Sequence, residues 1–330
     1  MNPITLLLVA LGVTTVWFLW MWRRVSQKSK PDVPGKKKHT VYHSVVALVM
    51  CFFDTLGVGN FATTTAAFKF RNSVPDEKIP GTLNVGYTMQ TVAQALIYIS
   101  LVQVDAWTLI LLIVAAVAGA WLGAGVVSHW PRRKIQIGMG CCLFGASVVI
   151  ALQIIGNYKP AADFIINNVP ALQGAVERIQ HLFSGGQAQG LAGIRLGIGL
   201  AGNFLLGALM TLGIGLYAPC LMMVSLLGMN PVAAFPIMMG SCAFLMPIGG
   251  MRFIKAGSYA PWTSVVMSIA GIPAVLVAAY IVRQLEVNQV RGLVFLVVLY
   301  TAATMLRSAM KEKQNNPAPA RTPDTNASTA

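Results

Sequence analysis

A single carboxylate, Asp54, lies inside an apolar run that begins at Val45. A carboxylate in the hydrocarbon of a membrane is costly, so by default it indicates a functional site. Asp54 could carry a coupling proton if burial favours its protonated form, because burial disfavours a charged carboxyl group. It could equally cap or hydrogen-bond the turn that follows it. The residue types alone leave both roles open.

The apolar run breaks directly after Asp54, at Leu56-Gly-Val-Gly-Asn60, and then resumes. Glycine permits a tight turn and a close approach of the backbone to a ligand. A helix that restarts at mid-membrane has unpaired N–H groups and a positive dipole end, which favour an anion. Asn60 is suited to cap this junction, and the hydroxyls of Thr63 and Thr64 add donors. The simpler alternative is that the glycines only let helices pack closely.

The same pattern occurs a second time in the chain. Thr55-Leu-Gly-Val-Gly-x-Phe-Ala62 matches Thr211-Leu-Gly-Ile-Gly-x-Tyr-Ala218 with a shift of 156 positions. The same shift places Pro80 on Pro236. We therefore infer two halves of one duplicated unit.

The two turns together predict a substrate site. Broken apolar segments at matching places in two halves are typical of the binding site of a transporter, and two helix N-termini would form a small anion pocket. Asp54 is the proton-coupling candidate, and its counterpart Met210 is apolar. Asn84 and Ser241, on the helices that follow the turns, would be explained equally well by interhelical hydrogen bonds. The predicted substrate-binding residues are Gly57, Gly59, Asn60, Thr63, Thr64, Asn84, Gly213, Gly215, Pro219 and Ser241.

The composition is that of a membrane protein. Of the 330 residues, 56% are hydrophobic and 10% are charged, whereas soluble domains carry about 25% charged residues. Apolar runs of roughly 20 residues recur, long enough to cross the hydrocarbon as helices, and barrel strands would alternate instead. The net charge of +14 lies in short loops, which indicates membrane orientation and not nucleic-acid binding.

The chain divides into five segments. Residues 1–40 form an uncleaved transmembrane helix, at about 3–22, and a basic loop. Residues 41–156 and 196–310 are the two repeats. Residues 157–195 connect them and carry a helical apolar face (Leu172, Val176, Ile179, Phe183) that predicts a helix on the membrane surface, and residues 311–330 are a disordered tail. Broken segments are predicted at 41–72 and 197–228, and plain helices at 81–102, 107–128, 135–155, 231–251, 262–282 and 291–307.

The basic residues indicate how the broken segments lie in the membrane. If these segments crossed it, the basic run at 132–134 would face outward. If they are re-entrant hairpins, 19 of the 24 Lys and Arg residues lie on the cytoplasmic side, as the positive-inside rule requires. We therefore predict an all-α polytopic membrane protein of the cell (inner) membrane, N-terminus outside and C-terminus cytoplasmic. It is an inverted repeat of two units, each a re-entrant broken-helix hairpin plus three transmembrane helices, preceded by one N-terminal helix.

Several other classes of protein and site are not supported. The five cysteines (Cys51, Cys141, Cys142, Cys220, Cys242) lie in apolar segments without CxxC spacing and are predicted to be small buried hydrophobes. No metal site and no cofactor are predicted. The chain lacks the GxxxxGK[ST] signature of ATP binding. It also lacks HExxH, and its four histidines fall at membrane edges or in loops, so an embedded enzyme is disfavoured. A passive anion channel stays open as the alternative.

Three motifs carry a resemblance to a known family. They are the duplicated Gly-x-Gly turn, Leu227-Gly-Met-Asn-Pro-x-x-Ala-x-x-Pro236, and Gly-Ser-Cys-Ala at 240–243. With them, the chain resembles the sulfite exporter TauE/SafE family over about 45–310. The resemblance implies a secondary-active permease for a small sulfur-containing or organic anion such as sulfite or sulfoacetate, usually in export. The expected partners are this solute and the lipid bilayer, and a homo-oligomer is allowed.

Overall fold

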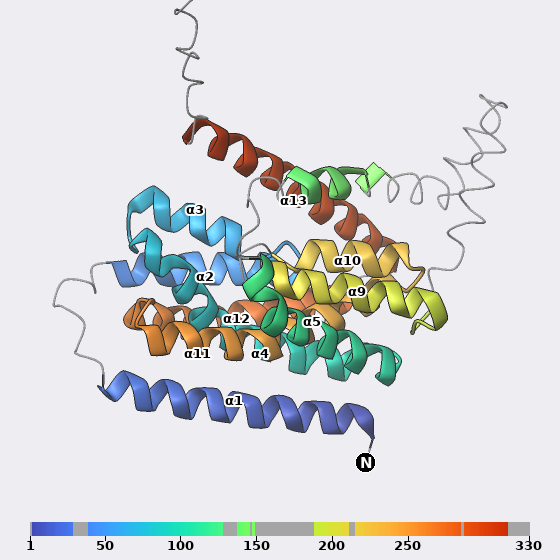
Figure 1. Ribbon diagram of the computed structural model, residues 1–330, viewed down its shortest axis with the longest axis horizontal. Helices are drawn as coiled ribbons and strands as arrows, with labels where there is room; N and C mark the ends of the chain where they lie inside the picture. The colour runs from blue at the N-terminus through green and yellow to red at the C-terminus, as the bar shows by residue number, and fades with distance from the viewer. Residues whose placement is uncertain are drawn as a thin grey trace, which may run out of the picture.

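The protein is built from helices. The computed structural model describes residues 2–28, 39–127, 137–145, 147–148, 188–210, 215–284 and 287–315, and Figure 1 shows it from the side. Within these ranges the structure contains helices and turns and no β-strand. The elements are α1 (Pro3–Lys28), α2 (Thr40–Thr55), α3 (Phe61–Arg71), η2 (Asp76–Lys78), α4 (Ile79–Leu101), α5 (Ala106–Val127), α9 (Gly193–Met210), α10 (Tyr217–Leu226), η4 (Pro231–Ala233), α11 (Ala234–Ala256), α12 (Pro261–Gln284) and α13 (Val287–Asn315).

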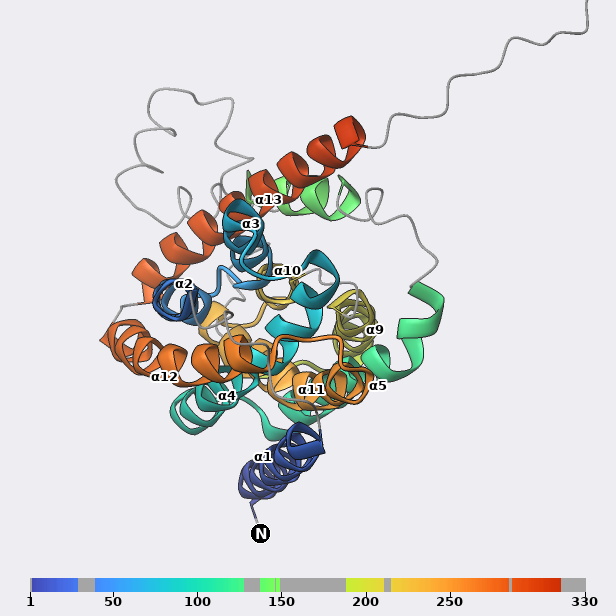
Figure 2. The same cartoon turned by 90° about the vertical axis from the view of Figure 1, so that its left-hand side faces the viewer.

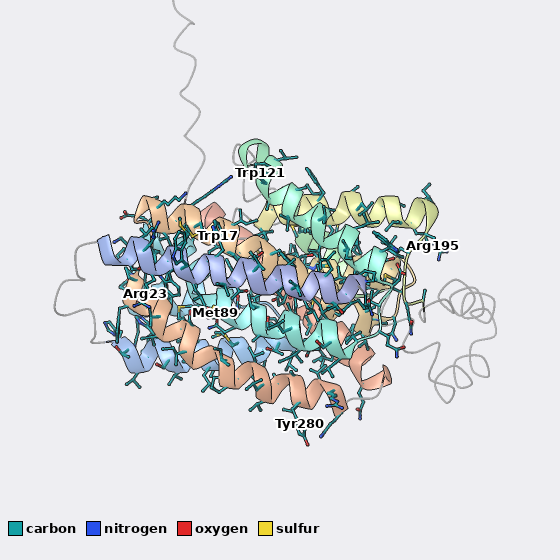
Figure 3. The ribbon with its side chains drawn as sticks, turned by 90° about the horizontal axis from the view of Figure 1, so that it is seen from below. Trp17, Arg23, Met89, Trp121, Arg195 and Tyr280 are labelled. Carbon is teal, nitrogen blue, oxygen red and sulfur yellow. The ribbon has the colours of Figure 1, made fainter. Side chains whose placement is uncertain are left out.

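The helices are those of a multi-pass membrane protein. In the described part of the chain, four are long and apolar enough to cross a membrane: Pro3–Ser26, Gly193–Met210, Pro231–Ala256 and Pro261–Gln284. Large apolar and aromatic side chains such as Trp17, Trp121 and Tyr280 point outward from the bundle (Figure 3). Since hydrocarbon solvates apolar side chains, such a surface suits contact with lipid. The predicted all-α, polytopic fold class is confirmed.

Helices are present where the plain helices were predicted. Those expected at 81–102, 107–128, 231–251, 262–282 and 291–307 are α4, α5, α11, α12 and α13. The one expected at 135–155 is helical at 137–145, and the rest lies almost entirely outside the described residues. The predicted surface helix at Leu172–Phe183, the basic run at 132–134 and most of the terminal tail lie outside them as well.

The cysteine prediction is wrong for two of the five residues. Cys51, Cys220 and Cys242 are buried, but Cys141 and Cys142 are exposed. The reason is that hydrocarbon and protein interior are both apolar. A small apolar residue in a membrane helix can therefore face either one, and its type does not distinguish the two environments.

Each broken segment folds back on itself. The hydroxyl of Tyr42, at the start of α2, donates to the carbonyl of Ala67 near the end of α3 at 2.7 Å. Arg71, the last residue of α3, has its guanidinium 4.8 Å from the centre of the Tyr42 ring. In the second half Gly199, near the start of α9, lies against Leu227, which follows α10. The two arms of each segment therefore lie antiparallel.

The two broken segments approach one another from opposite ends of the bundle. In Figure 1, α2 and α3 fill the left half, whereas α9 and α10 fill the right half. Each is followed by a short 3-10 helix and then a long helix, η2 with α4 and η4 with α11. The packing partners correspond too, because α2 packs on α12 and α9 packs on α5. This pattern is what a two-fold axis between two units would produce.

The long helices α4 and α11 pack against each other at the centre, and α1 lies outside the bundle (Figure 2). The tightest contact is between α5 and α9. A Cβ atom on Gly207 would overlap the carbonyl oxygen of Ala116, and one on Gly119 would overlap that of Phe204. Small residues let membrane helices approach this closely. The contact positions the end of α9, from which the second turn begins.

Candidate functional site

A cavity of about 90 Å³ lies between the two turns. Its volume is well above the roughly 10–15 Å³ that one water needs, so a ligand of a few heavy atoms fits. The first turn and the start of α3 contribute Asp54, Gly59, Asn60 and Thr63, and the second turn contributes Gly215 and Tyr217. Side chains from α4, α11 and α13 complete the wall. The cavity therefore brings both halves of the chain to one place.

Two helix N-termini meet at this cavity. Asn60 is the N-cap residue of α3 and Leu216 is the N-cap residue of α10, and both line the cavity. Neither makes a side-chain capping hydrogen bond, so the prediction that Asn60 caps the junction is wrong. Its amide is instead one of the groups around the cavity. Both helix N-termini keep the positive dipole end and N–H groups that favour an anion.

Glycine makes the first turn possible. Gly57 has φ +99° and Gly59 has φ +82°, both in the left-handed region that L side chains rarely adopt. A Cβ on Gly57 would lie 3.4 Å from Leu221 on α10, whereas one on Gly59 would meet nothing within 4 Å. Gly57 thus allows close packing of the first turn on the second hairpin, and Gly59 faces the open space of the cavity.

Asp54 is buried, and its carboxyl group accepts hydrogen bonds from the backbone N–H of Asn60, at the start of α3, and from the side-chain amide of Gln94. The side chain of Asp54 is 2% exposed, and its Oδ2 accepts the hydrogen bond from Gln94 Nε2 at 3.0 Å. The same Nε2 donates to Thr55 Oγ1 at 2.9 Å. The Thr55 hydroxyl itself donates to Cys51 O, so it must accept from the amide nitrogen of Gln94. This fixes the orientation of the Gln94 side chain.

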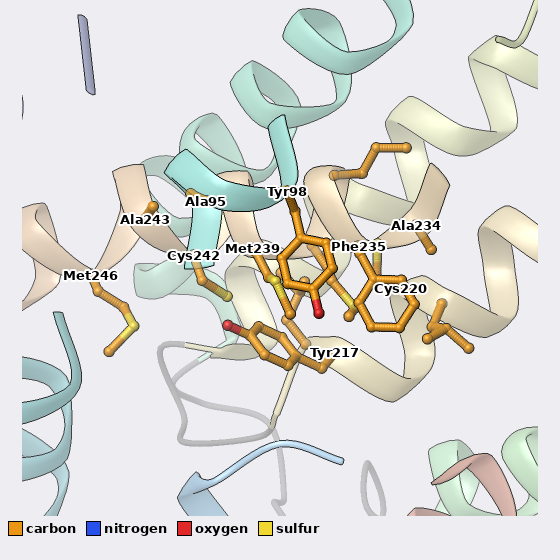
Figure 4. Close-up of a cluster of buried hydrophobic side chains, with 14 of the residues drawn as sticks. Ala95, Tyr98, Tyr217, Cys220, Ala234, Phe235, Met239, Cys242, Ala243 and Met246 are labelled. Carbon is orange, nitrogen blue, oxygen red and sulfur yellow. The ribbon is translucent and has the colours of Figure 1, made fainter. Parts of the chain in front are cut away.

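Gln94 also reaches the second hairpin. Its Oε1 accepts from the hydroxyl of Tyr217, the first residue of α10, at 2.9 Å. Tyr217 lies with Cys242 and Met246 of α11 in the cluster of Figure 4. One glutamine of α4 therefore connects the carboxylate of the first turn with the helix N-terminus of the second. Any movement of one hairpin tip relative to the other has to break or shift this connection.

The charge around Asp54 is not balanced locally. None of the described residues that line the cavity is Lys, Arg or His. A carboxylate that is buried without a cation is costly, whereas its neutral form keeps the hydrogen bond to Gln94 at less cost. Nor does any group of three or more His, Cys, Asp or Glu side chains come together to hold a metal ion in the described ranges. The cavity therefore combines two helix N-termini with one carboxyl group and no basic side chain among its described residues.

Five of the candidates from the sequence lie at the cavity. These are Asp54, Gly59, Asn60, Thr63 and Gly215. Gly213, in the second turn, lies outside the described residues.

The other five candidates do not line the cavity. Gly57 packs behind the turn against Leu221, and Pro219, the third residue of α10, is buried. Thr64 shares a 2.6 Å hydrogen bond with the Tyr87 hydroxyl. Asn84 donates to Pro80 O within α4 at 2.9 Å. Ser241 accepts from Asn203 Nδ2 at 3.1 Å, which is the interhelical alternative.

Some residues of the site were not selected from the sequence: Gln94, which bonds to the cavity residues Asp54 and Tyr217 without lining the cavity, and Tyr217, Thr301 and Thr304, which line it. Gln94 carried a usable signal, because an amide in a transmembrane helix interior is uncommon and needs a partner. Tyr217 carried a weaker one, because it lies two residues after the second Gly-x-Gly. Thr301 and Thr304 of α13 line the cavity as well. These two threonines carried no signal in the sequence, because the sequence of α13 is that of an ordinary membrane helix. Only the tertiary fold brings α13 to the cavity.

The comparisons with known proteins agree with this picture for the first half. Residues 2–150 match the sequence model of the sulfite exporter TauE/SafE family. This is a family of membrane transporters, and the matched part contains α1 to α5, with the first turn and Asp54. No curated protein and no solved structure matches the chain.

Proposed function

We propose, from the premise that residues 2–150 match a family of sulfite exporters, that this membrane protein is a secondary-active exporter of a small anion. A sulfur-containing or organic anion such as sulfite or sulfoacetate fits best. The observation that carries the proposal is the meeting of two helix N-termini, of α3 and α10, at one cavity. Backbone N–H groups and helix dipoles there provide the anion site without a basic side chain.

In this mechanism Asp54 is neutral while the anion is bound. Two negative charges in one water-poor cavity repel strongly, so binding of the anion favours protonation of the carboxyl group. Proton and anion then move together, so net export requires that the outward gradient of the anion exceed the opposing inward gradient of protons. The two hairpins provide alternating access by shifting relative to each other as an inverted repeat, with the site fixed between them.

The second turn offers a direct test of the site. A Cβ on Gly215 would meet nothing within 4 Å, so Gly215→Val is expected to fill the cavity without overlapping a neighbour. We expect uptake into proteoliposomes to fall at least about tenfold for whichever of sulfite, thiosulfate, sulfoacetate and acetate the native protein carries, because even a small steric loss of 1.4 kcal/mol is tenfold. The native protein should also be stabilised thermally by the same anion, and the variant should not.

Gly197→Val is the matched control for this test. Gly197 lies on α9, where a Cβ again meets nothing within 4 Å, but it does not line the cavity. Full uptake by the Gly215 variant would place the anion elsewhere. Absence of uptake for every anion in the native protein would overturn the transport proposal itself.

The proposed orientation places the start of α2, the end of α3 and η2 at the cytoplasm, with the N-terminus outside. With Cys141 and Cys142 replaced by serine, a cysteine at Lys78 should react with an impermeant maleimide only after the cells are permeabilised. A cysteine at Gln103, at the opposite end of α4, should react in intact cells. The reverse pattern would show the opposite orientation, and equal reactivity of both positions in intact cells would contradict the hairpin topology.

A further inference from the structure

A second, larger cavity of about 330 Å³ lies beyond the C-terminal end of α4. Its wall comes from the end of α4, the end of α12 and the start of η4, together with Gln189. Gln103, Gln189 and Asn230 provide side-chain amides, and Arg283 provides a guanidinium. Arg283 is the one charged side chain among the described residues of this wall. In the proposed orientation the cavity opens to the outside.

Tyr98 connects the wall of the second cavity to the first turn. It lines the second cavity and is 3% exposed. The ring stacks on Phe235 with centroids 5.1 Å apart and planes 15° apart, next to Tyr217 in Figure 4. The Tyr98 hydroxyl donates to the carbonyl of Thr55 at 3.3 Å. Thr55 follows Asp54, which lines the first cavity, so Tyr98 joins the wall of the second cavity to the residue next to Asp54.

We propose that the second cavity is an outer binding station for the same small oxyanion, with Arg283 as its cation and the Tyr98–Phe235 pair as the barrier to the central site. This inference rests on the proposed function. A guanidinium binds the oxygens of a small oxyanion in a bidentate manner, and amide N–H groups supply further donors. No guanidinium lines the central cavity in the described residues. The station would therefore bind the anion before it loses its water and enters the central cavity.

The electrostatics support a station at this end. The C-terminal ends of α4 and α12 carry negative dipole ends that repel an anion. Arg283, in the last turn of α12, offsets this repulsion and provides an attractive charge at the cavity. A purely structural role of Arg283 would be this offset alone. Lysine distinguishes the two roles, because it keeps the positive charge but not the bidentate geometry. It would replace Arg283 fully in the structural role and only in part in anion binding.

The test is the exchange of labelled sulfite, and separately of sulfoacetate, across right-side-out vesicles that contain the full chain. Arg283→Gln is expected to raise the KM for the external anion at least about fivefold, with little change in maximal exchange, because a charge in a cleft raises the local concentration of its ligand. The rise should shrink at high ionic strength. Arg283→Lys should raise the KM by less.

Arg195→Gln is the matched control, because Arg195 is an exposed cation near the start of α9 and does not line this cavity; Figure 3 labels it. An unchanged KM in Arg283→Gln, or an equal rise in both variants, would overturn the station while leaving transport intact. Tyr98→Ala should join the two cavities and give a flux of the anion that continues without a co-transported proton and without a counter-anion. If the Tyr98→Ala variant shows normal exchange and no leak, the Tyr98–Phe235 pair is not the barrier. Absence of any exchange in the native protein would overturn both this inference and the proposed function.

Discussion

Asp54→Asn is expected to abolish accumulation of the anion driven by a pH gradient, while anion–anion exchange continues. Asparagine has the shape of the neutral carboxyl group and can still accept the hydrogen bond from Gln94, which the native Asp54 accepts at 3.0 Å. It cannot release a proton. With one proton per anion, a gradient of about one pH unit sustains at most about a tenfold concentration ratio. In the variant the ratio should stay near unity, as measured in proteoliposomes with and without the gradient.

Asp105→Asn is the control for Asp54→Asn. The Asp105 carboxylate accepts from the backbone N–H and hydroxyl of Thr108, both at 2.8 Å, and it does not line the central cavity. Its accumulation ratio should equal that of the native protein. If Asp54→Asn still accumulates the anion, Asp54 has only a structural role in the turn. If the native protein shows flux but no accumulation, it is the passive channel.

Gly207→Val is expected to cause the largest loss of stability of any substitution named here. The new side chain would overlap the carbonyl oxygen of Ala116 on α5, and backbone cannot rotate away as a side chain can. Overpacking costs typically about 1–3 kcal/mol, and a rigid partner places the cost at or above the top of that range. The apparent melting temperature in detergent should fall, and transport should be lost with it because α9 leads into the second turn.

Gly197→Val separates this effect from the change in helix propensity when glycine is replaced by valine. It places the same residue in the same helix, where a Cβ meets nothing within 4 Å. Its melting temperature should stay close to that of the native protein. A similar fall for both substitutions would show that the close contact of α5 and α9 contributes little to stability.

Membrane helices and the position of the first turn could be predicted from sequence for a physical reason. Apolar length and glycine position are local properties, and the bilayer makes them decisive. Asp54, Gly59 and Gly215 were found because a carboxylate or a Gly-x-Gly break in hydrocarbon has few structural explanations. The antiparallel arms could be predicted from the positions of the basic residues in the sequence, because these residues favour re-entrant hairpins over membrane-crossing segments.

The rest of the site depends on contacts between distant parts of the chain. Gln94 meets Tyr217 across more than a hundred residues of sequence, and no local pattern specifies which helix an amide will reach. Thr64 and Ser241 have the right residue type, but their hydroxyls are used by Tyr87 and Asn203. Whether a polar group in a membrane helix serves a ligand or another helix is decided by tertiary packing alone.

The carboxylate stands in one hairpin only, with Met210 at the matching place in the other. Two identical halves would make the inward-facing and outward-facing forms equal in free energy, and a membrane with no gradient would hold them in equal numbers. Asp54 is one of the residues that would remove this degeneracy, because its protonation would add to the free energy of each form by a different amount. If the proposed duplication supplies two interconvertible forms, an unmatched carboxylate makes their populations depend on pH.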